Sequence, residues 1–83
     1  MTVVLGEKLK GDKGCPVSGH YENRRRVITI DRNEPPYYQW FVYYHELAHV
    51  AMYDAGLDSA FSERMTETLC DIIATARMRE RFG

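Results

Sequence analysis

The stretch His45-Glu46-Leu47-Ala48-His49 lies in a run from residue 37 to residue 55 that contains no glycine or proline. Apolar and aromatic residues recur almost all round a helical projection of this run, which predicts a central helix covered on several sides. Side chains four residues apart on a helix lie one above the other, so the imidazoles of His45 and His49 can reach one ion. Glu46 points about 100° further round the helix, towards a water molecule on that ion.

This arrangement of two histidines and a glutamate is typical of a zinc (Zn2+) site that keeps one position open for water. We therefore predict that His45 and His49 bind zinc and that Glu46 is the general base. For the ends of the helix, we expect a cap at Asn33 or Asp31 and a C-terminal stop at Gly56. Two prolines, Pro35 and Pro36, fit the first turn.

Three segments before this helix have the composition of strands. The clearest one alternates β-branched residues, with Val27 and Thr29 facing one way and Ile28 and Ile30 the other. The sequence predicts an α+β fold, in which a small antiparallel sheet of two or three strands packs on a two-helix hairpin. The strand candidates are residues 2–9, 19–25 and 26–31.

A second helix is expected after a short connection, with Asp58 or Ser59 as its cap and its end near Arg81. Apolar residues recur along this segment. They are Phe61, Met65, Leu69, Ile72, Ile73 and Ala76.

Two histidines do not complete a catalytic zinc site, so a third protein ligand is expected. Counted at about 1.5 Å per residue from the turn, both Glu63 and Glu67 reach the level of His49. Asp71, one turn after Glu67, comes near the level of His45, where a carboxylate can accept the other ring hydrogen. We favour Glu67 as the third ligand and Asp71 as the residue that orients His45, and Glu63 stays open as the alternative ligand.

The totals describe one small domain spanning residues 1–83. A composition of 45% hydrophobic and 28% charged residues is that of a soluble globular protein, and a net charge of −1 gives no electrostatic case for nucleic acid or an acidic membrane. No apolar run approaches the roughly 18 residues of a membrane span, and the N-terminus does not have the pattern of a signal peptide. We expect a cytoplasmic protein, and its oligomeric state stays open.

Two cysteines are too few for a disulfide framework. Cys70 falls inside the second helical pattern, where a small buried thiol is expected. Cys15 follows a glycine in a turn-rich stretch. It is interpreted as a free thiol, with a disulfide partner or an inhibitory metal ligand as the alternatives.

The two motifs together resemble the gluzincin metallopeptidases, in which His-Glu-x-x-His is followed on a later helix by a glutamate ligand and an aspartate four residues on. The second motif here reads Glu67-Thr68-Leu69-Cys70-Asp71, with seventeen residues between His49 and Glu67. That spacing is similar to the compact ImmA/IrrE-type peptidases and the minigluzincins, and the resemblance covers about residues 26–78. A metzincin would carry a glycine and a third histidine soon after His49, and residues 50–56 have neither at the right place.

The resemblance implies a zincin fold reduced to its core and hydrolysis of a peptide or protein substrate, with zinc held by His45, His49 and Glu67. The strand at residues 26–30 is expected to lie at the sheet edge and to align the substrate backbone by strand addition. Candidate donors to the transition state are His20, Tyr21 and Tyr53.

Two other interpretations stay open. The chain could bind zinc without catalysis, as an interaction domain or as a latent form with Cys15 as a fourth ligand. It could also be a metal-free helix hairpin that carries the motif by chance.

Overall fold

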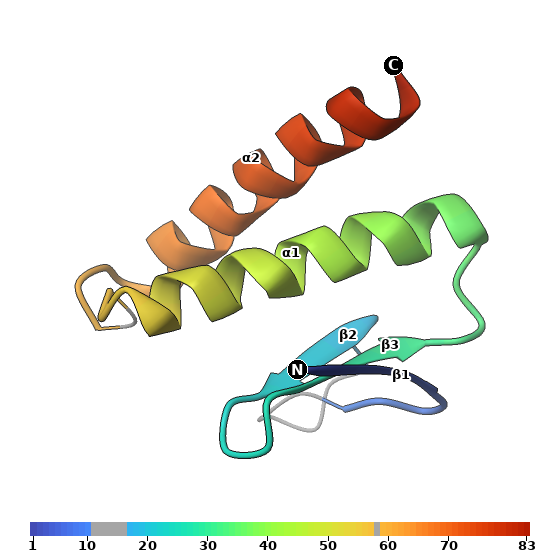
Figure 1. Ribbon diagram of the computed structural model, residues 1–83, viewed down its shortest axis with the longest axis horizontal. Coiled ribbons are helices and arrows are strands. Elements are labelled where there is room, and N and C mark those ends of the chain that lie inside the picture. The colour runs from blue at the N-terminus through green and yellow to red at the C-terminus, as the bar shows by residue number, and fades with distance from the viewer. Residues whose placement is uncertain (11–16, 58) are drawn as a thin grey trace.

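The computed structural model describes residues 1–10, 17–57 and 59–83. Helix α1 crosses the middle of the molecule, with the sheet on one side and helix α2 on the other (Figure 1). This arrangement confirms the α+β class. Cys15 and Asp58 lie outside the described residues. The elements are β1 (Thr2–Gly6), β2 (Gly19–Glu22), β3 (Val27–Asp31), α1 (Pro36–Asp54) and α2 (Glu63–Phe82).

The three strands form one mixed sheet in the order β1-β3-β2. Strands β2 and β3 pair antiparallel, as expected, but β1 runs parallel to β3, with Thr2 opposite Val27. The prediction of a wholly antiparallel sheet is therefore wrong for β1. The reason is the strand order, because β3 returns from β2 into the space beside β1 and runs in the direction of β1. For the same reason residues 26–30 do not form an edge, and the edges are β1 and β2.

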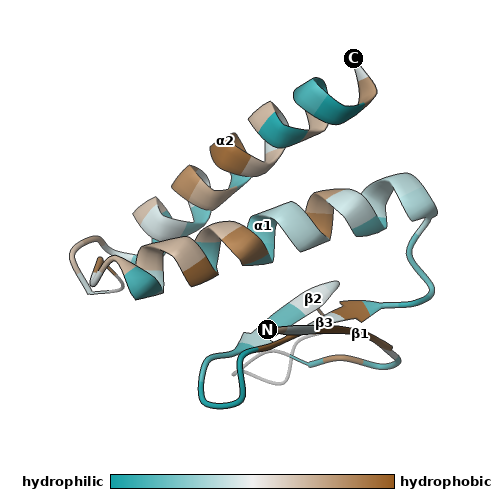
Figure 2. Cartoon of the chain, in the orientation of Figure 1, coloured by the Kyte–Doolittle hydropathy of each residue, from teal (hydrophilic) through white to brown (hydrophobic). Residues whose placement is uncertain are grey.

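The core lies between β3 and α1. Ile28 and Ile30 are 0% and 4% exposed and pack against Val42 and Val50 of the helix. The predicted facing of β3 is confirmed. Figure 2 shows hydrophobic colour along β1 and hydrophilic colour in the turn that joins β2 to β3.

The ends of α1 differ in how well the sequence predicted them. Pro35 is the N-cap, without a side-chain cap bond, and Pro36 is at N1. A cap at Asn33 or Asp31 is wrong, because the carboxylate of Asp31 instead accepts a hydrogen bond from the Asn33 N–H at 2.9 Å. The expected stop at Gly56 is confirmed. Its φ of 75° and the bond from the Leu57 N–H to the Met52 carbonyl close the helix as a Schellman motif.

Helix α2 begins later than the sequence predicted. Ser62 is its N-cap, and the Ser62 hydroxyl accepts a hydrogen bond from the Met65 N–H at 3.1 Å. Ser59 does not have this role, and the connection between the helices is longer than expected. With Ser62 as the cap, the helix begins at Glu63, and the capping bond satisfies the N–H of its third residue, Met65.

Helix α2 packs on α1 through a second cluster of buried side chains. Cys70 is 0% exposed and lies beside Ala48 and Met52, with its sulfur 3.8 Å from the Met52 sulfur. The expectation of a buried thiol at Cys70 is confirmed. Neither described helix combines the length and hydrophobicity that would let it cross a membrane.

Candidate metal centre

His45 and His49 project from the same face of α1, one turn apart. Their Nε2 atoms are 3.2 Å from each other, and their side chains are 16% and 24% exposed. Helix periodicity alone produces this stacking, and the central place of α1 leaves both rings only partly open to solvent.

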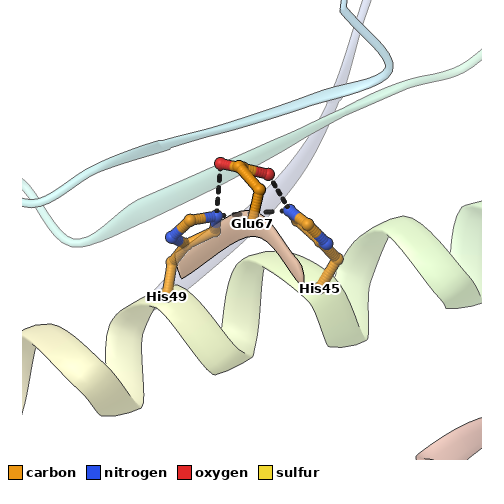
Figure 3. A group of neighbouring side chains, drawn as sticks. All are labelled: His45, His49 and Glu67. Carbon is orange, nitrogen blue, oxygen red and sulfur yellow. Dashed lines mark hydrogen bonds and ion pairs between the residues drawn. The ribbon is translucent and has the colours of Figure 1, made fainter. Parts of the chain in front are cut away.

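Glu67 reaches across from α2 to both rings. Its Oε2 lies 2.9 Å from His45 Nε2 and its Oε1 lies 3.1 Å from His49 Nε2 (Figure 3). The observed start of α2 explains why Glu67 meets the rings. Glu67 lies about 6 Å into α2, while His49 lies about 8 Å from the end of α1. Glu63 is the first residue of α2 and stays beside the turn.

The spacing of these three residues fits a metal ion. Two ligands about 2.0–2.1 Å from a tetrahedral zinc lie roughly 3.3–3.4 Å apart. The three separations in the structure, 2.9, 3.1 and 3.2 Å, come close to this value. Two imidazole nitrogens and a carboxylate oxygen also match the donor set of a catalytic zinc site. His45, His49 and Glu67 therefore form a group that can hold a metal ion, the one such group among the described residues.

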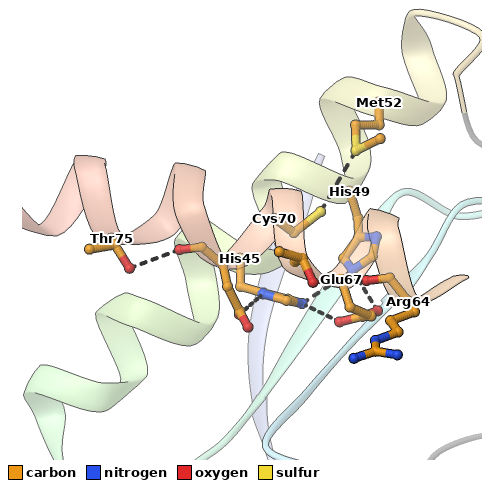
Figure 4. Close-up of polar contacts among 9 residues, drawn as sticks. His45, His49, Met52, Arg64, Glu67, Cys70 and Thr75 are labelled. Carbon is orange, nitrogen blue, oxygen red and sulfur yellow. Dashed lines mark hydrogen bonds and ion pairs between the residues drawn. The ribbon is translucent and has the colours of Figure 1, made fainter. Parts of the chain in front are cut away.

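Asp71 contacts the far side of the His45 ring. Its Oδ1 lies 2.8 Å from His45 Nδ1. Figure 4 shows the His45, His49 and Glu67 side chains together with the neighbouring Cys70 and Met52. A carboxylate at this distance favours the tautomer with hydrogen on Nδ1, so Nε2 keeps its lone pair towards His49 and Glu67. The sequence had placed Asp71 at the level of His45, and the structure brings the two side chains together.

Glu46 lies beside the three possible ligands and is not one of them. Burial raises the pKa of its carboxyl to about 7, with a further increase from Glu67 and an opposing effect of His45. Burial also lowers the pKa of His49, against the effect of Glu67. A carboxyl group with a pKa near neutrality can both accept and donate a proton, as acid–base chemistry requires.

A cleft passes over the metal centre and has two compartments that share Val17, Gly19, Glu46 and Glu67. The aromatic compartment, of about 370 Å³, is on the His45 side. The acidic compartment, of about 440 Å³, is on the His49 side. Besides the shared residues, Ser18, Tyr38, Phe41, Val42, His45 and Asp71 line the first, and His20, Tyr21, Asn23, His49, Tyr53 and Glu63 line the second.

The edge of β2 borders this cleft. The Asp31 N–H donates to the Ser18 carbonyl at 2.8 Å. Ser18, just before β2, and Asp31, at the end of β3, are therefore a hydrogen-bonded pair of the antiparallel ladder. Such pairs alternate along an antiparallel ladder, so His20 turns its backbone groups to β3, while Gly19 and Tyr21 turn theirs outward. The strand beside the site is therefore β2, and residues 26–30 lie one strand further away.

Among the candidate donors, Tyr21 has its hydroxyl 3.1 Å from the Asn23 carboxamide, to which it donates. His20 and Tyr53 line the acidic compartment. The sequence interpretation missed Tyr38 and Phe41, although they precede His45 by seven and four residues, the spacing of a shared helix face.

Gly19 was also missed. A Cβ there would lie 2.3 Å from Val42 Cγ1, so β2 approaches α1 as closely as a glycine permits. Nothing local in the sequence indicates such a contact. Cys70 contributes no reactive group to the site, because burial raises the pKa of its thiol to about 11, with further increases from Glu67 and Glu46.

Comparison with known proteins agrees with this geometry. The chain matches the peptidase M78 family, described as the IrrE N-terminal-like domain, over residues 4–82. It belongs to this family, whose name indicates metallopeptidase-type chemistry. No curated protein and no solved structure matched the chain.

Proposed function

We propose that the protein is a zinc-dependent peptidase of the gluzincin type, with His45, His49 and Glu67 as ligands and Glu46 as general base. The observation that carries this proposal is the meeting of two Nε2 atoms and one carboxylate from separate helices, at separations of 2.9–3.2 Å. A bound zinc ion would lower the pKa of water towards 7 and polarise the scissile carbonyl.

The remaining steps belong to side chains of this protein. Glu46 accepts a proton from the attacking water and then donates it to the nitrogen of the leaving amine. Its pKa of about 7 suits both transfers near neutral pH. Asp71 holds His45 in the tautomer that presents Nε2.

The substrate would be an extended peptide or unfolded protein segment. Gly19 and Tyr21 offer backbone N–H and C=O groups at the edge of β2, and strand addition to such an edge binds a backbone with little regard for its side chains. This assigns to β2 the role that the sequence had given to residues 26–30.

The test compares wild type with Glu46→Gln after both are loaded with zinc. We expect one zinc per chain in both proteins, hydrolysis of an unfolded protein by wild type, and a loss of roughly a hundredfold or more in the variant. Equal hydrolysis by the two proteins would refute the role of Glu46. Zinc binding without hydrolysis by wild type would favour the alternative, a zinc-binding interaction domain or latent form.

A further inference from the structure

We infer that the cleft selects substrates by the order of two side chains, a cationic one before the scissile bond in the acidic compartment and a large apolar one directly after it in the aromatic compartment. This inference rests on the proposed function and adds a substrate class to it. It depends on three observations, namely the direction of β2, the aromatic wall before His45 and the third carboxylate beside His49.

The direction of the substrate follows from β2. This strand begins at Gly19, next to Val42, and continues to Tyr21, which lines the acidic compartment with Tyr53. An added strand pairs slightly more stably when it is antiparallel. The substrate then enters with its N-terminal half over Tyr21 and leaves with its C-terminal half over Gly19.

The metal centre divides these two halves. Glu46 and Glu67 line both compartments, His45 lines only the aromatic one, and His49 lines only the acidic one. A peptide bond attacked at this junction has its preceding residue on the His49 side and its following residue on the His45 side.

The aromatic compartment is built for an apolar group. The rings of Tyr38 and Phe41 stack at 5.7 Å with an interplanar angle of 17°, and Phe41 continues to His45 at 6.5 Å. Tyr38 is 41% exposed, so ring surface remains for a substrate side chain to cover. Removal of such surface from water favours binding of a large apolar residue.

The acidic compartment has a carboxylate beyond those the reaction uses. Three carboxylates line each compartment, and Glu46 and Glu67 belong to both. The third on the aromatic side, Asp71, is engaged by His45 Nδ1 at 2.8 Å. The third on the His49 side, Glu63, makes no ion pair within the described part of the chain. The described residues that line this compartment include no lysine or arginine. An arginine or lysine side chain of the substrate would complement this charge.

The experiment uses two peptides of equal composition, incubated with the zinc-loaded full chain. Both have flanks of alanine and serine, and the central pair is Arg-Phe in one and Phe-Arg in the other. Mass spectrometry identifies the cleaved bond, and initial rates give kcat/KM. We expect cleavage between Arg and Phe, with kcat/KM about tenfold or more above that of the reversed peptide.

Two variants test the compartments separately. Phe41→Ala should reduce the advantage of Phe over Ala after the scissile bond, and Glu63→Gln should reduce the advantage of Arg over Ala before it. Both should retain one zinc per chain. The matched controls are Phe61→Ala and Glu80→Gln, which are exposed residues outside the cleft and should leave both preferences unchanged.

The outcomes separate this inference from the proposed function. An unfolded protein digested in parallel reports peptidase activity of any specificity. If the unfolded protein is cleaved but the two peptides are cleaved at equal or reversed rates, the inference is overturned and the proposed function stands. No cleavage of the unfolded protein or of either peptide overturns both.

Discussion

Asp71 contacts Nδ1 of His45 at 2.8 Å, and Nε2 of the same ring lies towards His49 and Glu67. Without this acceptor the ring can turn and can place its hydrogen on Nε2. We expect Asp71→Ala to weaken zinc binding by about 10–100-fold, the usual effect of removing such a partner. The zinc affinity of Asp71→Asn should fall between those of Asp71→Ala and wild type, because the amide oxygen still accepts a hydrogen bond.

Competition with a chromogenic chelator measures these affinities, and circular dichroism checks the fold. Glu80→Gln, an exposed change on the same helix, should bind zinc as wild type does. If Asp71→Ala also bound zinc as tightly as wild type, Asp71 would have no part in orienting His45.

Glu46 should make the metal-free protein less stable as the pH rises. Its carboxyl has a folded pKa of about 7 and an ordinary value of 4.5, so between these values the folded state binds more protons than the unfolded state. Stability from this group is therefore lost as pH increases through that window. The difference corresponds to at most about 3 kcal/mol.

Urea unfolding of wild type and Glu46→Gln, both with chelator, measures this effect. From pH 4 to pH 8, the free energy of unfolding of Glu46→Gln should rise by about 1–3 kcal/mol relative to that of wild type. A stability difference that does not change with pH would show that Glu46 titrates normally in the folded protein.

For single residues, the sequence predicted the position of a side chain in the site wherever that position depends on spacing within one helix. His45 and His49 could be placed together because four residues make one helical turn. Glu67 and Glu63 could not be separated by spacing alone, since that depends on where α2 begins, and the choice for Glu67 used Asp71 as a second requirement. Gly19 was beyond sequence reasoning, because its neighbour Val42 is distant in the chain.

At the scale of elements, the contact between β2 and α1 depends on Gly19. Gly19→Ala places a Cβ 2.3 Å from Val42 Cγ1, so the strand must move away from the helix. We expect a loss of about 1–3 kcal/mol in the free energy of unfolding, as for overpacked cores. Peptidase activity should fall as well, because the same strand edge borders the cleft.

Gly56→Ala is a useful comparison in the same unfolding and activity measurements. Its φ of 75° is unfavourable for alanine, but no atom lies within 4 Å of its Cβ position. It should lose about 1–2 kcal/mol of stability and retain activity. Val42→Ala should partly rescue Gly19→Ala, and a failure to rescue would exclude the clash as the cause.

The N-cap of α2 gives an independent test of where this helix begins. Ser62→Ala removes the acceptor of the Met65 N–H and should cost about 1 kcal/mol in urea unfolding. Ser59→Ala should be close to neutral. The reverse result would restore the start predicted from sequence.

The sequence could predict the approximate extent of the elements but not the arrangement of the sheet. Hydrophobic alternation identified β3 and its buried face. In the order β1-β3-β2, β1 pairs with a strand that is not its neighbour in sequence, and no local pattern encodes that pairing. Both faces of β1 are partly apolar, so its sequence is equally compatible with parallel and with antiparallel pairing at the edge of a sheet.

At the scale of the whole molecule, zinc should stabilise the fold, because its ligands come from both helices. Binding at a free zinc concentration 1,000 times Kd contributes about 4 kcal/mol. In a domain of this size each kcal/mol shifts Tm by about 4–8 °C, so chelation should lower Tm by well over ten degrees.

Scanning calorimetry with and without chelator measures this shift. Glu67→Gln and His49→Ala should largely abolish it, while Glu63→Gln should retain it. A Tm that is indifferent to chelator in wild type would favour the metal-free helix hairpin with a fortuitous motif.

Among the described elements, α2 packs on α1 and on no strand. The two histidines belong to α1, and Glu67 belongs to α2, which packs on no other described element. A single proteolytic cut in the connection between the helices would therefore divide the ligand set between two polypeptides. One piece would hold the sheet, both imidazoles and Glu46, and the other would hold Glu67 and Asp71. Metal binding would require both pieces, so it would report whether the two pieces had reassociated.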